Sequence, residues 1–343
     1  MGLRHDDSDP SAGARVTFGG DVMLGRLVGE AILHHGGAYP LGPVAGLMRA
    51  ADLTIVNLEC AITSSAHLWP GAPKAFYFGA PLPAIASLTG AGVDLVSLAN
   101  NHVLDYDVTG LRDTMRALRR HGIALAGAGE NLAQACAPAI VERAGMRFGM
   151  ACFCDHQEDF AARQDAPGMA YLDMDDAPAT LSAWRDALAA LRREHVDWPI
   201  LSLHWGPNMV RRPSARFRRL AHGAIDMGWK ILFGHSAHVF QGIELYRGCP
   251  ILYAVGDLVD DYYVDPEFRN DHQLLIEMEL GRSDVRRVLL HPLLIGRCQV
   301  RPASGEHFRW IVKTMTTLCR ELGTAVSEEE GVMLIRIQAD GVP

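Results

Sequence analysis

The chain has 343 residues, 49% of them apolar, and a formal net charge of -8. This length and apolar content suit one large α/β domain with a sizeable core. The negative charge argues against a nucleic-acid-binding protein, which would need a basic face. The net negative charge does not exclude a small anionic substrate, because a bound metal ion can supply positive charge locally.

The sequence contains no feature that predicts membrane insertion. It has no run of about 18 apolar residues, the length that a transmembrane helix needs. Residues 1–14 are polar and acidic and lack the basic start and apolar core of a signal peptide. We therefore expect a disordered lead-in over 1–14 and a cytoplasmic protein. The seven cysteines form no CxxC pair, which favours reduced, structural thiols.

Strand-like and helix-like segments alternate along the chain. We expect strands at residues 15–19, 53–57, 94–98, 123–126, 138–142, 147–153, 199–204, 230–234, 251–255 and 273–280. We expect helices at residues 25–35, 41–50, 82–90, 109–121, 178–195, 213–227 and 303–325. This alternation predicts a largely parallel sheet covered by helices, with functional residues at the carboxyl ends of the strands. We expect a main domain over 15–300 and a helix-and-strand extension over 301–343 that packs on it.

Five of the expected strands are followed by side chains that can bind a metal ion. The residues are Asp21, Glu59, Asn101 with His102, His204, and His235 with His238. Oxygen and imidazole ligands without cysteine favour manganese, iron, magnesium or zinc. Such a metal makes a water nucleophile available near neutral pH, so the pattern indicates a hydrolytic site.

Four of these residues also have a simpler structural explanation. Asp21 could cap the helix that begins near Leu24, and Glu59 could be a solvated loop carboxylate. Asn101 could stabilise a turn, and His102 could be a core histidine with satisfied hydrogen bonds. A carboxylate after a fully apolar strand is costly unless it is paired or metal-bound. The set as a whole therefore favours metal binding.

Further residues near these motifs have open alternatives. Asp105 could orient His102 through a carboxylate–imidazole hydrogen bond. It could instead cap the helix expected at 109–121, for which Asp107 is the better candidate. Arg26 could hold an anionic substrate group, because a guanidinium matches phosphate and carboxylate, or it could be an ordinary surface side chain.

Six segments match, in order, the motifs of a known family. They are Gly19–Arg26, Asn57–Glu59, Asn100–Tyr106, Leu203–Gly206, Gly234–His238 and Tyr253–Leu258. They resemble the CapA family, which is tied to poly-γ-glutamate capsule synthesis and belongs to the calcineurin-like metallophosphoesterase superfamily. The resemblance implies an α/β fold, a four-layer αββα sandwich in which two mixed central sheets carry metals at one edge.

The resemblance also implies roles for single residues. The implied metal ligands are Asp21 and His238 for a first ion, Glu59 as a bridge, and Asn101, His204 and His235 for a second. The cofactor would be one or two divalent ions of manganese, iron, zinc or magnesium. His102 would be the general acid, with Asp105 as its catalytic partner. The residues expected to contact substrate are Arg26, Asn57, Asn208 and Asp257.

The sequence departs from the family pattern at several positions. Met23 occupies the place of the histidine in the superfamily's Asp-x-His motif, so one metal loses a ligand. The site could be mononuclear, or dinuclear with one weak position. Asn208 stands where glutamate is common, and Asp257 where asparagine is common. The last motif reads Gly-His-Ser-Ala-His in place of Gly-His-His-Pro-His and keeps its outer histidines.

Three functions are consistent with these residues. The first is a metal-dependent hydrolase that cleaves a phosphoester or a γ-glutamyl-type amide in an anionic small molecule or a polyglutamate-type substrate. The second is a non-catalytic accessory protein in the assembly of poly-γ-glutamate or a related polymer, which Met23 supports and His102 argues against. The third is a tailoring enzyme in small-molecule biosynthesis. We expect no nucleic-acid partner and no direct membrane insertion, and the sequence leaves open a homo-oligomer.

Overall fold

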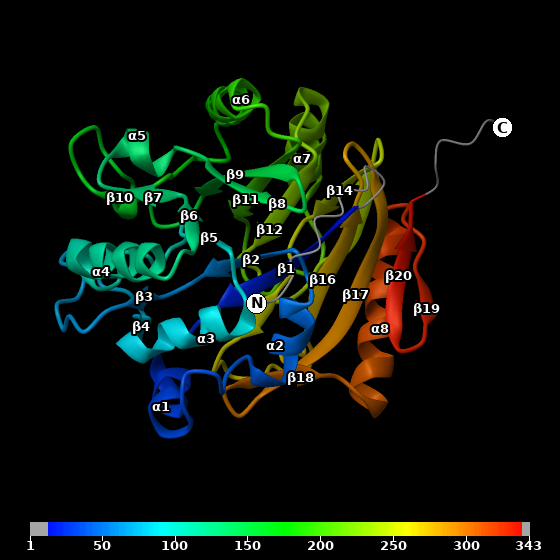
Figure 1. Ribbon diagram of the computed structural model, residues 1–343, viewed down its shortest axis with the longest axis horizontal. Helices are drawn as coiled ribbons and strands as arrows, with labels where there is room; N and C mark the ends of the chain where they lie inside the picture. Colours follow the sequence, from blue (N-terminus) through cyan, green and yellow to red (C-terminus); the bar gives the residue numbers. More distant parts are fainter. Residues whose placement is uncertain (1–12, 338–343) are drawn as a thin grey trace, which may run out of the picture.

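Figure 1 shows the computed structural model, in which residues 13–337 are described. Residues 1–12, which make up most of the expected lead-in, and residues 338–343 lie outside this range. Strand β1 begins at Ala14. Each strand and helix expected from the sequence is present within a few residues of its expected position.

The larger of the two main sheets has ten strands in the order β19-β20-β17-β16-β1-β2-β5-β6, with β15 beside β1 and β18 beside β17. Its strands are β1 (Ala14–Val22), β2 (Leu53–Leu58), β5 (Leu95–Ser97), β6 (Ala124–Ala126), β15 (Asp257–Val259), β16 (His272–Leu280), β17 (Val285–Gly296), β18 (Gln299–Pro302), β19 (Ser327–Glu329) and β20 (Val332–Arg336).

The smaller main sheet has six strands in the order β13-β14-β12-β11-β9-β8. They are β8 (Ala139–Arg143), β9 (Met146–Cys154), β11 (Trp198–His204), β12 (Ile231–His235), β13 (Ile243–Tyr246) and β14 (Cys249–Leu252). Two short strand pairs complete the described sheets, formed by β3 (Ala61–Ile62) with β4 (Gly79–Ala80) and by β7 (Ala128–Gly129) with β10 (Gly168–Met169).

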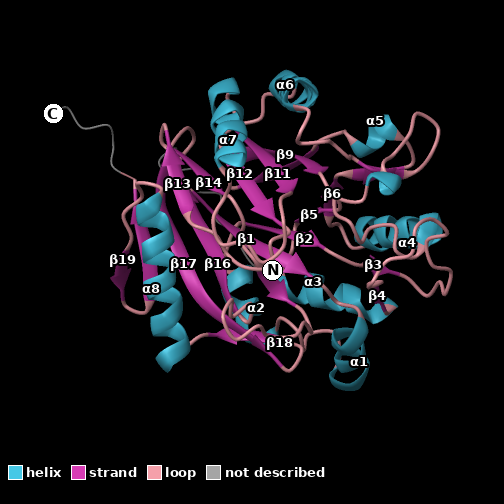
Figure 2. Ribbon diagram, turned by 180° about the vertical axis from the view of Figure 1, so that it is seen from behind, coloured by secondary structure: helices cyan, strands magenta, loops and turns pink. Residues whose placement is uncertain are grey.

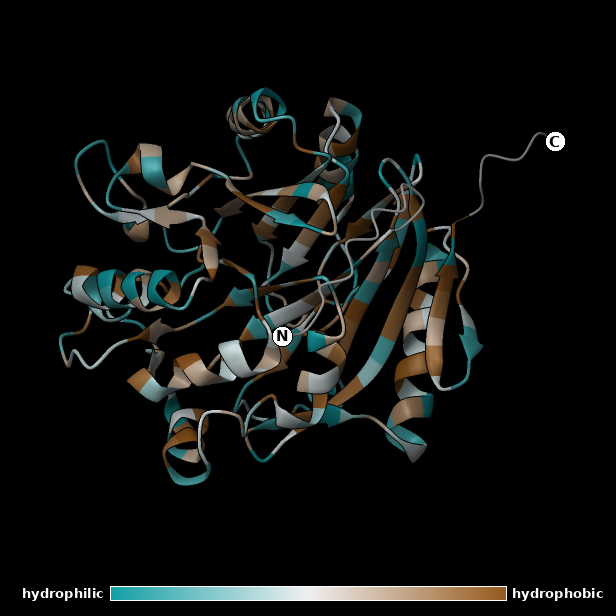
Figure 3. Ribbon diagram, in the orientation of Figure 1, coloured by the Kyte–Doolittle hydropathy of each residue, from teal (hydrophilic) through white to brown (hydrophobic). Residues whose placement is uncertain are grey.

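Eight α-helices and two short 3₁₀ turns connect the described strands. The helices are α1 (Arg26–His35), α2 (Gly42–Arg49), α3 (Ile85–Ala91), α4 (Asp107–Arg120), α5 (Leu132–Ala135), α6 (Ala177–Arg193), α7 (Ala215–Met227) and α8 (Gly305–Glu321), and the turns are η1 (Leu82–Ala84) and η2 (Glu158–Phe160). Helix α4 buries Leu111, Met115 and Leu118 on one face, and Figure 3 shows its mixed hydrophobic and hydrophilic residues. Between residues 13 and 337, no helix is long and apolar enough to cross a membrane.

The two main sheets face each other. Helices α6 and α7 contact β9, β11 and β12 of the smaller sheet (Figure 2). Helix α8 contacts β16 and β17 of the larger sheet and also β13 of the smaller one. Between the sheets, the rings of Phe18 on β1 and Phe233 on β12 lie 5.3 Å apart. The expected α/β architecture, with two central mixed sheets between helical layers, is confirmed.

The larger sheet is mixed, so the expectation of a largely parallel sheet was wrong for this half of the molecule. Strands β1, β2, β5 and β6 pair in parallel, whereas β16, β17, β18 and β20 pair antiparallel. Strand β17 was missed because Arg286, Arg287 and Pro292 interrupt its apolar pattern. Strand β20 pairs with β17 inside the same sheet, and the domain boundary at residue 300 stays a prediction.

Alternation along the strands of the smaller sheet explains where its histidines point. Leu203 packs in the cluster under α6 and α7, whereas Phe233 belongs to the cluster between the two sheets. Successive side chains of a strand point to opposite faces. His204, next to Leu203, and His235, two residues after Phe233, therefore extend the inward-facing rows to the carboxyl ends of β11 and β12.

Candidate metal centre

Strand ends from both sheets meet at one edge of the sandwich. The expected ligands Asp21, Glu59, Asn101, His204, His235 and His238 gather there, and Asp257 joins them. Asp21 does not cap α1, whose N-cap residue is Gly25 without a side-chain hydrogen bond. The first and last of these residues are more than 200 positions apart in sequence, so only the packing of the two sheets brings them together.

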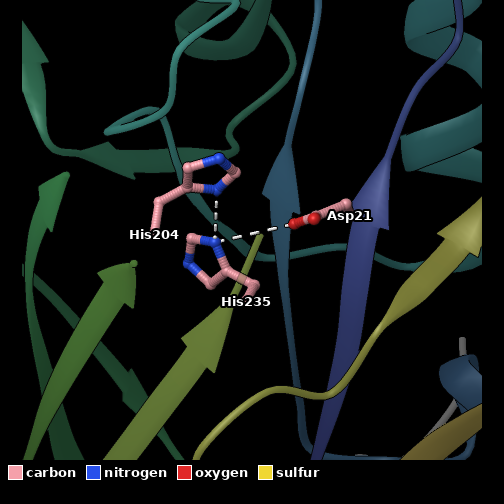
Figure 4. Close-up of side chains that lie close together, drawn as sticks. All are labelled: Asp21, His204 and His235. Atoms are coloured by element: carbon pink, nitrogen blue, oxygen red, sulfur yellow. Dashed lines mark hydrogen bonds and ion pairs between the residues drawn. The ribbon is translucent and has the colours of Figure 1, made fainter. Parts of the chain in front are cut away.

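The imidazoles of the smaller sheet form one side of the centre (Figure 4). Nδ1 of His204 lies 2.9 Å from Nδ1 of His235, which lies 3.5 Å from Oδ1 of Asp21. The other ring nitrogen of His235 lies 2.9 Å from the hydroxyl of Ser202. Because Ser202 engages Nε2, the Nδ1 atom of His235 is free to serve as a ligand.

His204 connects this group to two further candidate ligands. Its Nε2 lies 2.9 Å from Oδ1 of Asn101 and 3.7 Å from Oε1 of Glu59. All three side chains carry a lone pair that a divalent cation can accept. The arrangement places an amide oxygen, a carboxylate and two imidazoles around one small volume.

Carboxylates and His238 form the other side of the centre. Ligand atoms of Asp21, Glu59, His238 and Asp257 all lie within 4.8 Å of one another. Nδ1 of His238 is 3.0 Å from Oδ1 of Asp257 and 3.9 Å from Oδ2 of Asp21. Asp21 belongs to both groups of candidate ligands, as a residue shared by two ions would.

A glycine contact brings Asp257 beside Asp21. The backbone N–H of Asp21 donates to the carbonyl of Gly256 at 3.0 Å, and β1 and β15 pair with Asp21 opposite Asp257. A Cβ atom on Gly20 would lie 1.8 Å from that carbonyl, so only glycine permits the approach. Asp257 thus adds a carboxylate to the candidate centre beside Asp21.

Several carboxylate oxygens of the candidate centre lack partners that a cation would provide. Among the described residues, both carboxylate oxygens of Glu59 and Oδ2 of Asp257 are buried without a hydrogen-bond donor. Both side chains are fully buried. Leaving a buried carboxylate unpaired costs several kcal/mol. The oxygen and nitrogen donor set fits manganese, iron, magnesium or zinc, so the residues present suit the implied metal.

Burial raises the pKa values of the acids Asp21 and Glu59 and lowers those of the imidazoles of His204 and His235. Burial, together with the charge of Asp257, raises the pKa of Asp21 to about 7, and burial and the charge of Asp21 raise the pKa of Glu59 well above its usual value. Burial lowers the pKa of His235 to about 3 and also lowers the pKa of His204. The two imidazoles are therefore neutral at pH 7 with lone pairs available, whereas the acids hold protons that a cation would displace.

We expect the affinity for divalent metal to rise with pH between about 6 and 8, because metal and protons compete for the same ligands. Burial opposes charge on His238, but Asp257, Glu59 and Asp21 outweigh it and raise its pKa to about 10. The pKa of Asp21, about 7, is raised as well. Each bound ion should therefore release about one proton or more. Calorimetric titration with manganese in buffers of different ionisation enthalpy measures this release, and affinity that is unchanged across this pH range would contradict the expectation.

His102 lies next to the centre and is held by Asp105. Its Nδ1 is 2.5 Å from Oδ2 of Asp105, and its Nε2 is 4.0 Å from Oε1 of Glu59. Asp105 also accepts from the backbone N–H of Phe78 at 2.7 Å, and the Phe78 ring stacks on His102 at 3.7 Å. Asp105 thus orients His102, while α4 begins at Asp107 without a side-chain cap.

Sequence analysis missed Lys74, which supports this pair. Its ammonium contacts Oδ1 of Asp105 and the carbonyl of Asn101, and it lies 3.4 Å from Nδ1 of His102. Only 9% of its side chain is exposed. The sequence signal was the rarity of lysine, since Lys74 is one of three lysines among the 32 basic residues of the chain. In an arginine-rich chain, a lysine indicates a position where a compact ammonium fits better than a planar guanidinium.

An open cavity of about 700 Å³ borders the centre. Asn101, His102 and His238 lie on its wall, so a ligand in the cavity would meet the candidate metal ligands. Arg26 and Asn208, which were expected to contact substrate, also line it. A cavity of this size accommodates a small molecule or a short segment of a polymer.

Arg26 supplies a cation on this wall. Its Nε lies 3.4 Å from Oδ2 of Asp261, and its guanidinium lies 5.1 Å from the centre of the Phe76 ring. The acid and the aromatic face hold the arginine in place, and 35% of its side chain remains exposed. This position suits the binding of an anionic group at the cavity.

Asn57 and Asp257, also expected to contact substrate, lie instead among the candidate ligands and are fully buried. Asn57 donates to Oδ1 of Asp21 at 2.7 Å and lies 3.5 Å from Nδ1 of His204. Asn57 is therefore in a position to orient Asp21.

Met23 is also buried, and its sulfur accepts a hydrogen bond from the backbone N–H of Gly25 at 3.1 Å.

A second group of candidate ligands lies apart from this edge. Asp271, His272 and His307 bring ligand atoms within 4.8 Å of one another. The guanidinium of Arg269 already lies among them, 2.7 Å from Nε2 of His272 and 3.2 Å from Nδ1 of His307. It also forms two hydrogen bonds of 2.9 Å with Asp271. Arg269 thus supplies the positive charge that this group requires.

Comparison with known proteins agrees with the sequence motifs. A probable polyglutamine synthesis accessory protein of Mycobacterium tuberculosis is 30% identical over 354 aligned positions, which cover 91% of this chain and 92% of that protein. The PGA biosynthesis protein CapA of Bacillus subtilis is 26% identical, over 89% of this chain and 77% of that protein. The capsule biosynthesis protein CapA of Bacillus anthracis is 28% identical, over 72% of this chain and 59% of that protein.

A solved structure, the 5'-nucleotidase precursor from Thermus thermophilus, aligns with a TM-score of 0.46 and 12% identity, over 91% of this chain and 59% of that one. The family model described as "Bacterial capsule synthesis protein PGA_cap" matches residues 15–262. This match covers well over half of the chain and includes every candidate ligand of the metal centre at the sheet edge. The resemblance to CapA proteins is confirmed, and the chain belongs to the PGA_cap family of bacterial capsule synthesis proteins.

Proposed function

We propose that this chain is a metal-dependent hydrolase that cleaves a phosphoester or a γ-glutamyl-type amide in an anionic substrate. The observation that carries the proposal is the Glu59 carboxylate, fully buried with both oxygens unpartnered among the described residues. It lies beside three histidines and two aspartates at the edge of an open cavity. A purely structural role for Glu59 leaves both of its buried oxygens without a hydrogen-bond donor on the described chain.

The ligands would hold one or two divalent ions. They are Asp21, Glu59, Asn101, His204, His235 and His238, with Asp257 as an additional oxygen donor. When bound, such ions supply Lewis acidity that makes a water molecule nucleophilic near neutral pH and offsets charge on the substrate oxygens. Manganese, iron, zinc and magnesium all fit the donor set.

The residues around the ligands bind the substrate and move a proton. Arg26 attracts an anionic group at the cavity wall. His102 gives the proton from Nε2 to the leaving oxygen or nitrogen, while Asp105 keeps Nδ1 protonated and the ring oriented. Lys74 holds Asp105 in place and balances its charge. Phe78, stacked on His102, fixes the plane of the imidazole ring.

A non-catalytic accessory role in polymer assembly is the second candidate. The M. tuberculosis relative carries the word accessory in its name, and Met23 removes one histidine from the motif. The organised His102–Asp105–Lys74 group favours catalysis, because a binding module needs no oriented acid. A tailoring role in small-molecule biosynthesis would use the same hydrolytic residues. A cytoplasmic location belongs to the proposal as well.

The proposal is tested by metal analysis and a hydrolysis panel. The purified protein, the same protein stripped with a chelator, and stripped protein reloaded with manganese are assayed on phosphomonoesters, phosphodiesters and γ-glutamyl amides. We expect near-stoichiometric metal in the untreated protein, loss of turnover on stripping and its recovery on reloading. The substrates that turn over identify the bond. Metal binding without turnover on any substrate would favour the accessory role, and no metal after reloading would refute the metal centre.

A further inference from the structure

The hydroxyl of Tyr262 is a buried polar group without a partner on the described chain. Tyr253 provides a contrast, because its hydroxyl donates to Oε2 of Glu244 at 2.6 Å. Buried hydroxyls in native proteins normally have a hydrogen-bond partner, so an orphan one indicates a partner that is not part of the chain. For Tyr262, the cavity supplies the route by which that partner arrives, since Tyr262 is on its wall.

The ring of Tyr262 is held between the candidate metal ligands and the candidate acid. It meets the ring of His238 edge-on at 5.1 Å, and it stacks on Phe78 at 5.8 Å. Phe78 in turn stacks on His102. The backbone N–H of Tyr262 donates to Oδ1 of Asp260 at 2.8 Å. These contacts fix the direction of the hydroxyl before any ligand binds.

A phenol keeps its proton near neutral pH, so the hydroxyl of Tyr262 can act as a donor. The ring lies against His238, and both residues line the cavity. Oxygens of Glu59, Asp257 and Asp260 are also without donors among the described residues. A ligand oxygen that enters the cavity beside His238 would therefore lie close to the Tyr262 side chain.

We propose that Tyr262 is a catalytic residue whose hydroxyl donates a hydrogen bond to a phosphoryl or acyl oxygen of the substrate at the wall of the cavity. The inference rests on the proposed hydrolytic function, to which it adds a donor aimed at the oxygen that gains negative charge. Such a donor stabilises the transition state more than the ground state, because the charge on the oxygen grows during the reaction. It fits substrates with a tetrahedral phosphoryl group or an acyl carbon that becomes tetrahedral.

Tyr262→Phe is the direct test, because it deletes the hydroxyl and keeps the ring contacts. Tyr263→Phe is the matched control, since Tyr263 lines the same cavity but is 83% exposed. Both variants and the wild type are loaded with manganese. Bound metal, unfolding temperature, calorimetric affinity for inorganic phosphate, and kcat and KM on the best substrate of the panel are then measured.

We expect Tyr262→Phe to bind phosphate about tenfold more weakly and to lose about 10²-fold or more in kcat, with KM nearly unchanged. Metal content and unfolding temperature should match the wild type, and Tyr263→Phe should behave as the wild type throughout. Equal phosphate affinity and kcat in Tyr262→Phe would overturn the inference. Loss of metal in Tyr262→Phe would overturn it too, because the residue would then support the ligands.

The phosphate measurement separates this inference from the proposed function. Weaker phosphate binding by Tyr262→Phe without turnover by any of the proteins would refute hydrolysis and uphold the contact between Tyr262 and a substrate-like oxygen. Failure of the manganese-loaded wild type to bind phosphate would overturn the inference, since the cavity would then hold no phosphoryl oxygen for Tyr262 to contact.

Discussion

Replacing His235 with alanine is expected to lower the affinity of the centre for divalent metal by more than about 100-fold and to abolish turnover. Loss of a group that merely supports a ligand costs about 10–100-fold in metal affinity, so loss of a direct ligand should cost more. His235 is fully buried, with Nδ1 facing His204 and Asp21 and Nε2 engaged by Ser202. No neighbouring described side chain can take its place without moving a strand.

Elemental analysis and metal-dependent thermal unfolding check this expectation. The wild type should gain stability on addition of manganese, because a ligand that binds only the folded state stabilises it. His235→Ala should gain little. His34→Ala is the control for loss of an imidazole, since His34 is exposed in the last turn of α1. A His235→Ala protein that keeps wild-type metal content would remove His235 from the ligand set.

Replacing His102 with alanine should have the second large effect, a loss of about 10²–10⁴-fold in kcat with metal content unchanged. Its Nε2 lies near Glu59 without a hydrogen bond, whereas Nδ1 is held by Asp105. Burial lowers the pKa of His102 to about 4, although Asp105 acts in the opposite direction. The free imidazole is therefore neutral at pH 7, and its protonation should accompany entry of an anionic substrate.

The dependence on the leaving group distinguishes a general acid from a structural residue. Against substrates with good leaving groups, which need no proton, His102→Ala should lose much less activity than against poor ones. Asp105→Asn should show the same trend to a smaller degree, because it loosens the orientation of the ring without removing it. An equal loss with all leaving groups would assign His102 a positioning role. Full activity of His102→Ala with every substrate would favour the accessory function.

Much of the candidate site could be predicted because each ligand follows an apolar strand of recognisable length. His204 and His235 end runs in which apolar residues fill both faces, and a polar side chain at such an end is costly unless it has a partner. Local pattern is enough for this inference, since strand periodicity and the position of the strand end are properties of a short segment. The order of the motifs along the chain indicated the family and its fold.

Lys74 and Tyr262 could not be found in this way. Both come from segments outside regular strands and helices, where no periodicity relates a side chain to a face. Their places depend on contacts with distant residues, Lys74 with Asp105 and Tyr262 with Phe78 and His238. Strand β17 was not predicted for a related reason. Charged residues and Pro292 obscure its apolar pattern, and the strand is held in the sheet by its pairing with β16.

The sequence by itself determined the strands and helices that were expected, which of these strands end in ligand-type side chains, and to which family the chain belongs. Only the tertiary structure decided that Asp257 lies beside Asp21, that Asn57 orients a ligand, and that Glu59 has no partner on the described chain. The physical reason is that secondary structure follows from interactions between neighbours in sequence. The charge balance of a buried site is instead a sum over residues that only the packing of two sheets brings within a few ångströms of one another.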